Sequence, residues 1–467
     1  MKKQLSEIKL LTIFFAVRIL SFYFTPKTPL LAQHPINTLL TALIFILAVY
    51  WLIKKDIRGW YIVLLEIILG GSGGFLRLYF ISLRTALLIT SLTIFFIQKL
   101  IDEKYNIVKK TKRTSYFILI LIITAFISAI RGLYLGHERS AVISDFIPYL
   151  FLLYYFPLRD LWKVENFRNF TKKAIFSTII GEAIIILFTQ IGLSSGVFSL
   201  QDKYYHWYRD VALGKITDLN FHFYRLVLNE HLLIIPLIIY FINDIIKQKT
   251  NVTNTTALFC LIFILANNLT RIYMVALIFG MLFSFTFKNW KRWIAVSSTC
   301  IILFFLIFTT THTLASKGES LGLEIFGLRL QSIASPKIEE SSMSRLLLFP
   351  KILEKIENKP ILGEGLGDTV TAYSPIFKTN ITTPHFDWGY LEILAEMGLV
   401  GFIAWACFIL YIIRNKIFNN YKYNQTASAI LVSFLVINLT SPALFHVFGF
   451  LLLTTIIISS KKKHALI

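Results

Sequence analysis

Apolar stretches as long as a membrane-spanning helix recur along almost the whole chain. A spanning helix needs roughly 20 mostly apolar residues, and fewer where flanking side chains reach back to the interface. Hydrophobic residues make up 56% of the 467 residues, and the strict alternation of a transmembrane β-barrel is absent. The sequence therefore predicts an all-α, polytopic membrane protein, with about fourteen transmembrane helices in a single membrane domain over residues 1–467. Clear examples of such stretches are residues 11–24, 86–97, 118–130, 174–187, 232–242 and 294–308.

The formal net charge is +21, and the distribution of this charge indicates a membrane rather than a nucleic acid. A nucleic-acid-binding protein gathers its basic residues on one face or one arm. Here they cluster in short connections between apolar stretches, a pattern that holds such connections in the cytoplasm. We therefore expect the lipid bilayer as a partner, no nucleic acid, and both termini on the cytoplasmic side. The clusters are Lys54, Lys55 and Arg58; Lys109, Lys110, Lys112 and Arg113; Arg168, Lys172 and Lys173; Lys288, Lys291 and Arg292; Arg414 and Lys416; and Lys461, Lys462 and Lys463.

The connections between the expected spans alternate between the two faces of the membrane. Those after the even-numbered spans are cytoplasmic and hold most of the basic clusters. Two longer connections, residues 192–225 and residues 311–397, then fall outside, and the second of them joins spans 11 and 12. The spans are expected to begin near Lys9, Asn37, Trp60, Thr85, Tyr116, Ala141, Lys173, Leu226, Ala257, Ile272, Trp293, Gly398, Ser428 and Leu444.

The connection of residues 311–397 is too long for a simple turn, and its composition is not of low complexity. Within it, residues 346–356 predict an amphipathic helix, with Leu347 and Ile352 on one side and Lys351 on the other. Such a helix either lies on the membrane surface or forms a lid or platform over a site, and these two interpretations are compatible.

Two arginines stand at the outer ends of expected spans, where a charge is costly and needs a reason. Arg271 lies between two apolar runs, and Arg225 precedes the eighth span, so both face the same side as the connection of residues 311–397. Two guanidinium groups at one membrane face suit bidentate binding of a diphosphate at the level of the headgroups. Alternatively, each arginine reaches a lipid phosphate or pairs with a carboxylate such as Glu230.

His385 lies in the same outer connection, between Pro384 and Phe386. An imidazole titrates near neutral pH, so it is able to take a proton from a sugar hydroxyl as that hydroxyl attacks. Asp387 and Glu392 are candidates to orient His385 or to raise its basicity. The alternative is an ordinary loop histidine. The outer connections hold no Cys/His cluster and no Asp-x-Asp motif, so we expect neither a metal site nor a cofactor.

Three segments of the C-terminal half resemble the O-antigen polymerase/O-antigen ligase superfamily, the integral-membrane glycosyltransferases of bacterial surface polysaccharides. The first is Leu269-Thr270-Arg271, and the second is Arg345 followed by NKPILGEGLG at residues 358–367. The third is Pro384-His385 followed by LEILAEMGLVG at residues 391–401. The superfamily commonly has Asn or Ser after the histidine, where this chain has Phe386. The N-terminal half is similar only as an apolar profile of many spans.

The resemblance implies a metal-independent transfer of glycan from a polyprenyl-diphosphate donor at the outer face of the bacterial inner membrane. Arg271 and Arg225 would bind the diphosphate, and His385 would act as base on the acceptor hydroxyl. Arg345, Asp387 and Glu392, together with residues 363–367, would bind the substrate and shape the site. The implied partners are undecaprenyl-diphosphate-linked oligosaccharides and, in addition, a chain-length regulator.

Several functions are compatible with this resemblance. A polymerase joins lipid-linked repeat units, a ligase transfers the polymer to lipid A-core, and a protein O-oligosaccharyltransferase transfers it to serine or threonine. We favour the polymerase, because the expected span count exceeds the dozen or so typical of ligases and because Phe386 departs from the usual form of the histidine motif. A flippase or transporter of lipid-linked sugars would instead distribute its charges along a path through the membrane.

Overall fold

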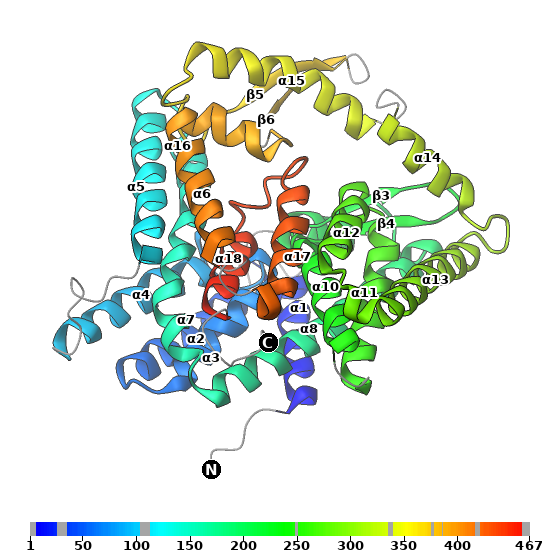
Figure 1. Ribbon diagram of the computed structural model, residues 1–467, viewed down its shortest axis with the longest axis horizontal. Coiled ribbons are helices and arrows are strands. Elements are labelled where there is room, and N and C mark those ends of the chain that lie inside the picture. Colours follow the sequence, from blue (N-terminus) through cyan, green and yellow to red (C-terminus); the bar gives the residue numbers. More distant parts are fainter. Residues whose placement is uncertain are drawn as a thin grey trace.

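The computed structural model consists mainly of helices packed into one bundle (Figure 1). It describes residues 6–25, 35–102, 113–247, 251–334, 340–374, 378–384, 386–415 and 421–459. The first helices are α1 (Glu7–Phe24), α2 (Ile36–Ile53), α3 (Ile57–Leu69), α4 (Leu83–Ile101), α5 (Arg113–Tyr134), α6 (Arg139–Leu150), α7 (Tyr155–Leu161), α8 (Glu165–Ser194) and α9 (Lys203–His206). The others are α10 (Ile234–Lys247), α11 (Val252–Asn268), α12 (Arg271–Ser284), α13 (Trp290–Ala315), α14 (Leu323–Ala334), α15 (Glu340–Asn358), α16 (Gly389–Ile413), α17 (Tyr421–Ile437) and α18 (Val447–Ser459).

The strands of the described residues form two-stranded antiparallel hairpins that connect helices. They pair β1 (Arg77–Leu78) with β2 (Ile81–Ser82), β3 (Lys215–Asp218) with β4 (Tyr224–Val227), and β5 (Val370–Ser374) with β6 (Thr379–Thr383). Each strand is short, so the hairpins depend on packing against the helices for their stability.

The helices confirm the prediction of an all-α, polytopic membrane protein. Among the described residues, eight helical segments are long and apolar enough to cross a membrane, and four shorter helices are also apolar. The number of about fourteen spans stays a prediction. The eight segments are Ile36–Ile53, Leu83–Ile101, Arg113–Tyr134, Arg139–Leu161, Glu165–Ser194, Asn229–Lys247, Phe287–Ala315 and Gly389–Ile413, and the shorter helices are Val252–Asn268, Arg271–Ser284, Gln425–Ile437 and Val447–Ser459.

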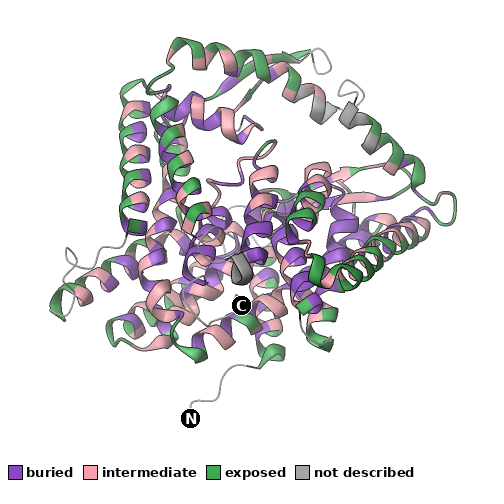
Figure 2. Cartoon of the chain, in the orientation of Figure 1, coloured by how far each residue is buried: buried purple, intermediate pink, exposed green. Residues whose placement is uncertain are grey.

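Many side chains on the outside of the bundle are apolar. Figure 2 shows buried residues concentrated in the middle of the bundle and exposed residues on the outer sides of α5 and α13. On α13, Ile301, Ile302 and Leu306 are 59%, 67% and 60% exposed. Since these side chains cannot hydrogen-bond to water, such a surface suits contact with lipid chains.

Helix ends that lead into basic connections meet at one end of the bundle. Lys55, after α2, contacts Asp102, after α4, with 2.7 Å between Nζ and Oδ1. Lys99 of α4 in turn lies 3.1 Å from Asp160 of α7. The ends of α2, α4 and α7 therefore share one face, as the alternating topology predicts. That this face is cytoplasmic, and that both termini are, stays a prediction.

A buried ion pair joins α1 to α8 inside the bundle. Nη2 of Arg18 donates to Oε1 of Glu182, and both residues are almost fully buried. The guanidinium of Arg18 also lies over the ring of Phe14, 3.4 Å from its centroid. Glu182 is one of the carboxylates in apolar surroundings for which the sequence gives no partner. Breaking a buried pair by removing one partner is costly, because the other charge stays buried.

Replacing Glu182 with alanine is expected to destabilise the protein by about 3–5 kcal/mol, because Arg18 then keeps a buried charge without its carboxylate. The double variant Arg18→Leu, Glu182→Leu should recover most of this loss, since no buried charge remains. Thermal unfolding of the purified protein in detergent measures both effects. Equal losses in the single and the double variant would contradict this account of the pair.

The connection between α8 and α10, which the sequence predicts to be extracytoplasmic, packs deeply onto the N-terminal helices. Nε1 of Trp207 donates to Oγ of Ser21 in α1 at 2.9 Å, and the Trp207 ring stacks on Phe75 at 5.8 Å between centroids. Gly74 lies directly against this connection, because a Cβ added to it would stand 1.8 Å from the carbonyl oxygen of Val211. The connection is therefore part of the core and not a loose loop.

The eighth expected span begins later than the sequence predicts. The prediction near Leu226 is wrong, because Tyr224–Val227 forms β4 and the helical segment runs over Asn229–Lys247. Strand β4 pairs with β3, and the register sets Thr217 opposite Arg225. Leu226 and Val227 are apolar and predict the start of a helix, whereas pairing with β3 makes this segment a strand.

The connection between α13 and α16 contains α14, α15 and the β5–β6 hairpin. Figure 1 shows α14 and α15 following one another across the top of the view, toward the start of α16. Helix α16 begins at Gly389, before the expected Gly398. Helix α15 contains the predicted amphipathic stretch of residues 346–356, and it buries Leu348 and Ile352 against the hairpin and α16. That α15 forms a lid or platform over a site stays a prediction.

Candidate functional site

Arg225 is fixed to the corner between α11 and α12. Helix α11 ends at Asn268, Leu269 adopts a left-handed conformation (φ 45°), and α12 begins after Thr270. Nε of Arg225 donates to the carbonyl oxygen of Asn268 at 2.9 Å, and Nη2 donates to Oγ1 of Thr270 at 2.9 Å. The structure thus brings together Arg225 and the residue that precedes Arg271. We call this group, Arg225, Asn268, Thr270 and Arg271, the arginine corner.

Arg271 is the first residue of α12 and is partly buried. The N-terminus of a helix carries a partial positive charge and N–H groups that point outward. With the guanidinium of Arg225 bonded to Thr270, the start of α12 provides a positive potential, and such a potential attracts an anion.

Arg345 and Asp387 form a second group between α15 and α16. Nε of Arg345 lies 3.6 Å from Oδ2 of Asp387, and the side chains are 25% and 43% exposed. Asp387 has φ 57°, a left-handed conformation that aspartate tolerates better than most residues. The ring of Trp388 contacts that of Phe349 on α15, with 5.7 Å between centroids. Both side chains are partly exposed, although Nε of Arg345 itself is buried, so a polar ligand can reach their exposed atoms.

Glu392 holds the chain that leads into α16. Its Oε2 accepts a hydrogen bond from the backbone N–H of Phe386 at 3.2 Å, and Glu392 is 5% exposed. Phe386 is fully buried against Leu348 and Ile352 of α15. His385 lies outside the described residues, so its predicted role stays a prediction. The residue that follows it is anchored by both a carboxylate and an apolar cluster.

The glycine-rich segment of residues 363–367 packs against α16 at the point where this helix is interrupted. Gly398 has φ 62°, which interrupts the helix and leaves carbonyl groups of the preceding turn without helical partners. The N–H of Glu364 donates to the carbonyl of Ala395 at 2.7 Å, and the N–H of Gly365 donates to that of Glu396 at 2.9 Å. The segment therefore replaces the missing helical hydrogen bonds.

The same segment is also bound by α5 and α6. Nε of Arg131 donates to the carbonyl of Gly363 at 2.7 Å, and Oδ2 of Asp145 accepts from the N–H of Gly367 at 3.0 Å. The N–H of Leu366 donates to the carbonyl of Ser128 at 3.1 Å. The glycines thus fix the start of α16 against the N-terminal half of the bundle, which is consistent with the expectation that they shape the site.

Replacing Gly365 with alanine is expected to abolish accumulation of the folded protein. A Cβ there would lie 2.3 Å from the backbone nitrogen of Gly132, and the φ of +95° disfavours any side chain. Gly136→Ala is the matched control, because Gly136 also has a positive φ of +86° but nothing within 4 Å of the added Cβ. That control should cost only about 1 kcal/mol. Size-exclusion chromatography of both variants measures the difference, and equal yields would argue against the close approach.

The arginine corner and the start of α16 lie at the same end of the bundle. Helices α12 and α17 pack along each other, and Nε2 of Gln425, at the start of α17, donates to the carbonyl of Phe285, just after α12, at 2.7 Å. The two helices are therefore antiparallel, and the start of α12, with Arg271, lies near the end of α17. Near that end, the carbonyl of Leu435 accepts from the hydroxyl of Tyr390 in α16 at 2.8 Å. The predicted site residues thus form two groups on the same face.

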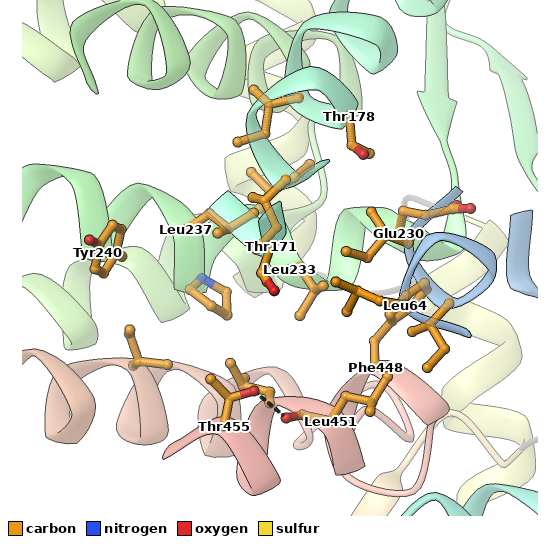
Figure 3. A pocket seen from close by; sticks show the side chains of 18 of the residues that line it. Leu64, Thr171, Thr178, Glu230, Leu233, Leu237, Tyr240, Phe448, Leu451 and Thr455 are labelled. Carbon is orange, nitrogen blue, oxygen red and sulfur yellow. Dashed lines mark hydrogen bonds between the residues drawn. The ribbon is translucent and has the colours of Figure 1, made fainter. Parts of the chain in front are cut away.

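An apolar cavity of about 200 Å³ lies between α3, α8, α10, α11 and α18 (Figure 3). Leu64, Leu237 and Leu451 are among the side chains that Figure 3 shows around it. Glu230 and His231 are among the few polar residues in its wall. The lining suits a hydrocarbon chain rather than a sugar.

Sequence reasoning missed two residues that support the arginine corner. His231 and Asn268 are buried polar residues that bond to each other, with 2.8 Å between Nδ1 and Nδ2. The signal available for Asn268 was its position two residues before the N-cap of α12, where short polar side chains often bond to the backbone. Nothing in the sequence around His231 indicates its partner. Among the described residues, no group of three or more His, Cys, Asp or Glu side chains is arranged to hold a metal ion.

These features define a polytopic membrane protein with a cationic corner and an anchored helix start on one face. Residues 256–406 match the family model of the O-antigen ligases. The predicted resemblance to the O-antigen polymerase/ligase superfamily is thereby confirmed for this part of the chain, and it supports a glycosyltransferase-like enzyme. The matched region includes Arg271, Arg345, Asp387 and Glu392, whereas Arg225 lies before it. No curated protein and no solved structure is significantly similar to the chain.

Proposed function

We propose that this protein polymerises polyprenyl-diphosphate-linked oligosaccharide repeat units at the outer face of the bacterial inner membrane. The observation that carries the proposal is the arginine corner, in which Arg225 is bonded to the residue that precedes Arg271. Two guanidinium groups and a helix N-terminus form a site for a diphosphate, which carries its charge at the level of the headgroups. The apolar cavity, whose wall includes His231 next to this corner, suits the isoprenoid chain of the donor.

In the proposed reaction, the oxygen of the acceptor hydroxyl forms a bond to the anomeric carbon of the donor sugar. The bond from that carbon to the diphosphate oxygen breaks, and the polyprenyl diphosphate leaves with the electron pair. His385 takes the hydroxyl proton, while Arg225 and Arg271 stabilise the negative charge that develops on the leaving group. No metal is required, because the arginines supply the positive charge.

The second group of residues would serve the acceptor. Arg345 and Asp387 offer a donor and an acceptor of hydrogen bonds at a partly exposed position, which suits sugar hydroxyls. Glu392 acts through the backbone, since it holds Phe386 next to His385. Holding donor and acceptor together at one face contributes several kcal/mol to lowering the barrier by itself, which explains why few catalytic groups suffice.

Transfer of a finished polymer to lipid A-core is the second candidate, and the description of the matched family model as O-antigen ligase favours it. The polymerase differs from this ligase only in the acceptor, which is the terminal sugar of another lipid-linked repeat unit. We prefer the polymerase for the two reasons given by the sequence, the expected span count and Phe386 after the histidine.

The glycans of a strain that lacks the gene test the proposal. We expect single repeat units on the lipid carrier, and full-length polymer after complementation with the wild-type gene. Long polymer that stays on polyprenyl diphosphate in the deletion strain would identify a ligase instead. Repeat units that remain at the cytoplasmic face, out of reach of an added periplasmic glycosidase, would identify a transporter. Unchanged surface polysaccharide in the deletion strain would overturn both transferase assignments.

A further inference from the structure

Asn268 is the centre of a buried hydrogen-bond network beneath Arg225. Its backbone carbonyl accepts from Nε of Arg225, and its Oδ1 accepts from the N–H of Thr270 at 3.2 Å and from the hydroxyl of Thr270. Its Nδ2 faces Nδ1 of His231 at 2.8 Å. Both Asn268 and His231 are 0–1% exposed. Because water cannot replace a lost partner at this depth, each of these bonds matters to its neighbours.

A donor and an acceptor can be assigned to each hydrogen bond in this network, starting from the backbone N–H groups. The N–H of Thr270 only donates, so the atom of Asn268 that faces it is the oxygen, and the amide nitrogen faces His231. Nδ1 of His231 must therefore accept, and it also accepts from the N–H of Leu228 at 3.2 Å. His231 is thus neutral, with its proton on Nε2. The Thr270 hydroxyl donates to Asn268 and accepts from Arg225.

The network connects segments that are far apart in the sequence. His231 lies just after β4, which carries Arg225, and Asn268 ends α11. The imidazole fixes the rotation of the Asn268 amide, the amide fixes the Thr270 hydroxyl, and that hydroxyl accepts from Nη2 of Arg225. A change at His231 is therefore transmitted to the guanidinium through two side chains.

We propose that His231 and Asn268 are positioning residues, which hold the guanidinium of Arg225 in the orientation that binds the diphosphate of the donor. His231 is buried and acts through Asn268. This inference rests on the proposed function of Arg225. It predicts that activity requires the hydrogen-bond acceptor at Nδ1 of His231. Ionisation of the imidazole is not required.

A matched pair of variants separates the acceptor from the rest of the ring. In His231→Asn the side-chain oxygen is as many bonds from Cα as Nδ1 is, so it accepts from Asn268 in the same way. In His231→Gln the amide lies one bond further out, and the Nδ1 position is left without an acceptor. We expect His231→Gln to raise the KM for the donor or lower kcat/KM by about 10–100-fold, because a misplacement of about 1 Å costs up to about 10²-fold. His231→Asn should stay within about threefold of the wild type by the same argument.

The experiment uses the full-length protein in detergent or nanodiscs and lipid-linked repeat units extracted from the deletion strain. Size-exclusion chromatography confirms that each variant is folded. The decisive readout is a double-mutant cycle with Arg225→Lys, which keeps the charge but cannot make both hydrogen bonds. If His231 acts through Arg225, His231→Gln lowers kcat/KM strongly in the wild type and by less than about twofold in the Arg225→Lys background.

The outcomes distinguish this inference from the proposed function. Independent, multiplying losses in the cycle would overturn the inference, and so would equal activity of His231→Gln and His231→Asn. If His231→Gln does not fold, Asn268→Asp, which keeps the acceptor oxygens and removes the Nδ2 donor, takes its place in the same cycle. Wild-type protein that transfers no glycan would instead contradict the proposed function. Full activity of Arg225→Lys would contradict the proposed role of Arg225.

Discussion

Replacing Arg271 with alanine is expected to lower glycan transfer by about 10²–10³-fold, because it removes one of the two guanidinium groups that we propose stabilise the leaving diphosphate. Arg271 begins α12 beside the N-cap Thr270, to which Arg225 is bonded, so its loss halves the positive charge of the side chains at this corner. Transfer is measured with the purified protein and lipid-linked repeat units, and the length of the products is measured in a complemented deletion strain.

Arg271→Lys and Arg209→Ala serve as controls for this prediction. Lysine keeps the charge but not the planar fork, so Arg271→Lys should retain more activity than the alanine variant. Arg209 lies in the connection between α8 and α10, which is also predicted to be outside, but its side chain is 51% exposed and is paired with Asp210, 2.9 Å from Nε to Oδ1. Its replacement should leave transfer unchanged. Wild-type activity of a folded Arg271→Ala variant would remove Arg271 from the site.

Replacing His385 with alanine is expected to lower transfer by about 10²–10⁴-fold, the usual contribution of a general base. The base must be deprotonated to act, so wild-type activity should fall as the pH becomes acidic. This acid limb of the pH profile should disappear in the variant. The pH dependence of kcat/KM, measured for both proteins, tests the role of the imidazole directly.

His206→Ala is the matched control for His385, because His206 lies in the other connection that is predicted to be outside, with a side chain that is 47% exposed. Its replacement should change neither the rate nor the pH profile. If His385→Ala keeps the acid limb at a lower rate, another group titrates and His385 only binds the acceptor. Full activity of this variant would show that the base lies elsewhere.

The amino-acid sequence by itself determined which segments form helices, because this property depends on local composition. Long apolar stretches predicted the helices of the bundle, and the spacing of apolar and charged residues predicted the amphipathic part of α15. The reason is physical. In a bilayer each spanning segment must satisfy its own backbone hydrogen bonds and present apolar side chains to lipid. Each such segment can therefore be recognised from its own residues. The resemblance to the family, which the sequence predicts from short local motifs, is likewise found over residues 256–406.

Only the tertiary structure decided which polar groups meet. Glu182 pairs with Arg18 from a distant helix, and Arg225 bonds to Thr270 across 45 residues. The strand over Tyr224–Val227 was likewise not predictable from local sequence. Its apolar residues predict a helix, but pairing with β3 makes it a strand. A buried polar group takes its partner from whichever segment packs against it, and packing depends on all helices at once. Local sequence therefore predicted the helices and the candidate charges, whereas their partners followed only from the packed bundle.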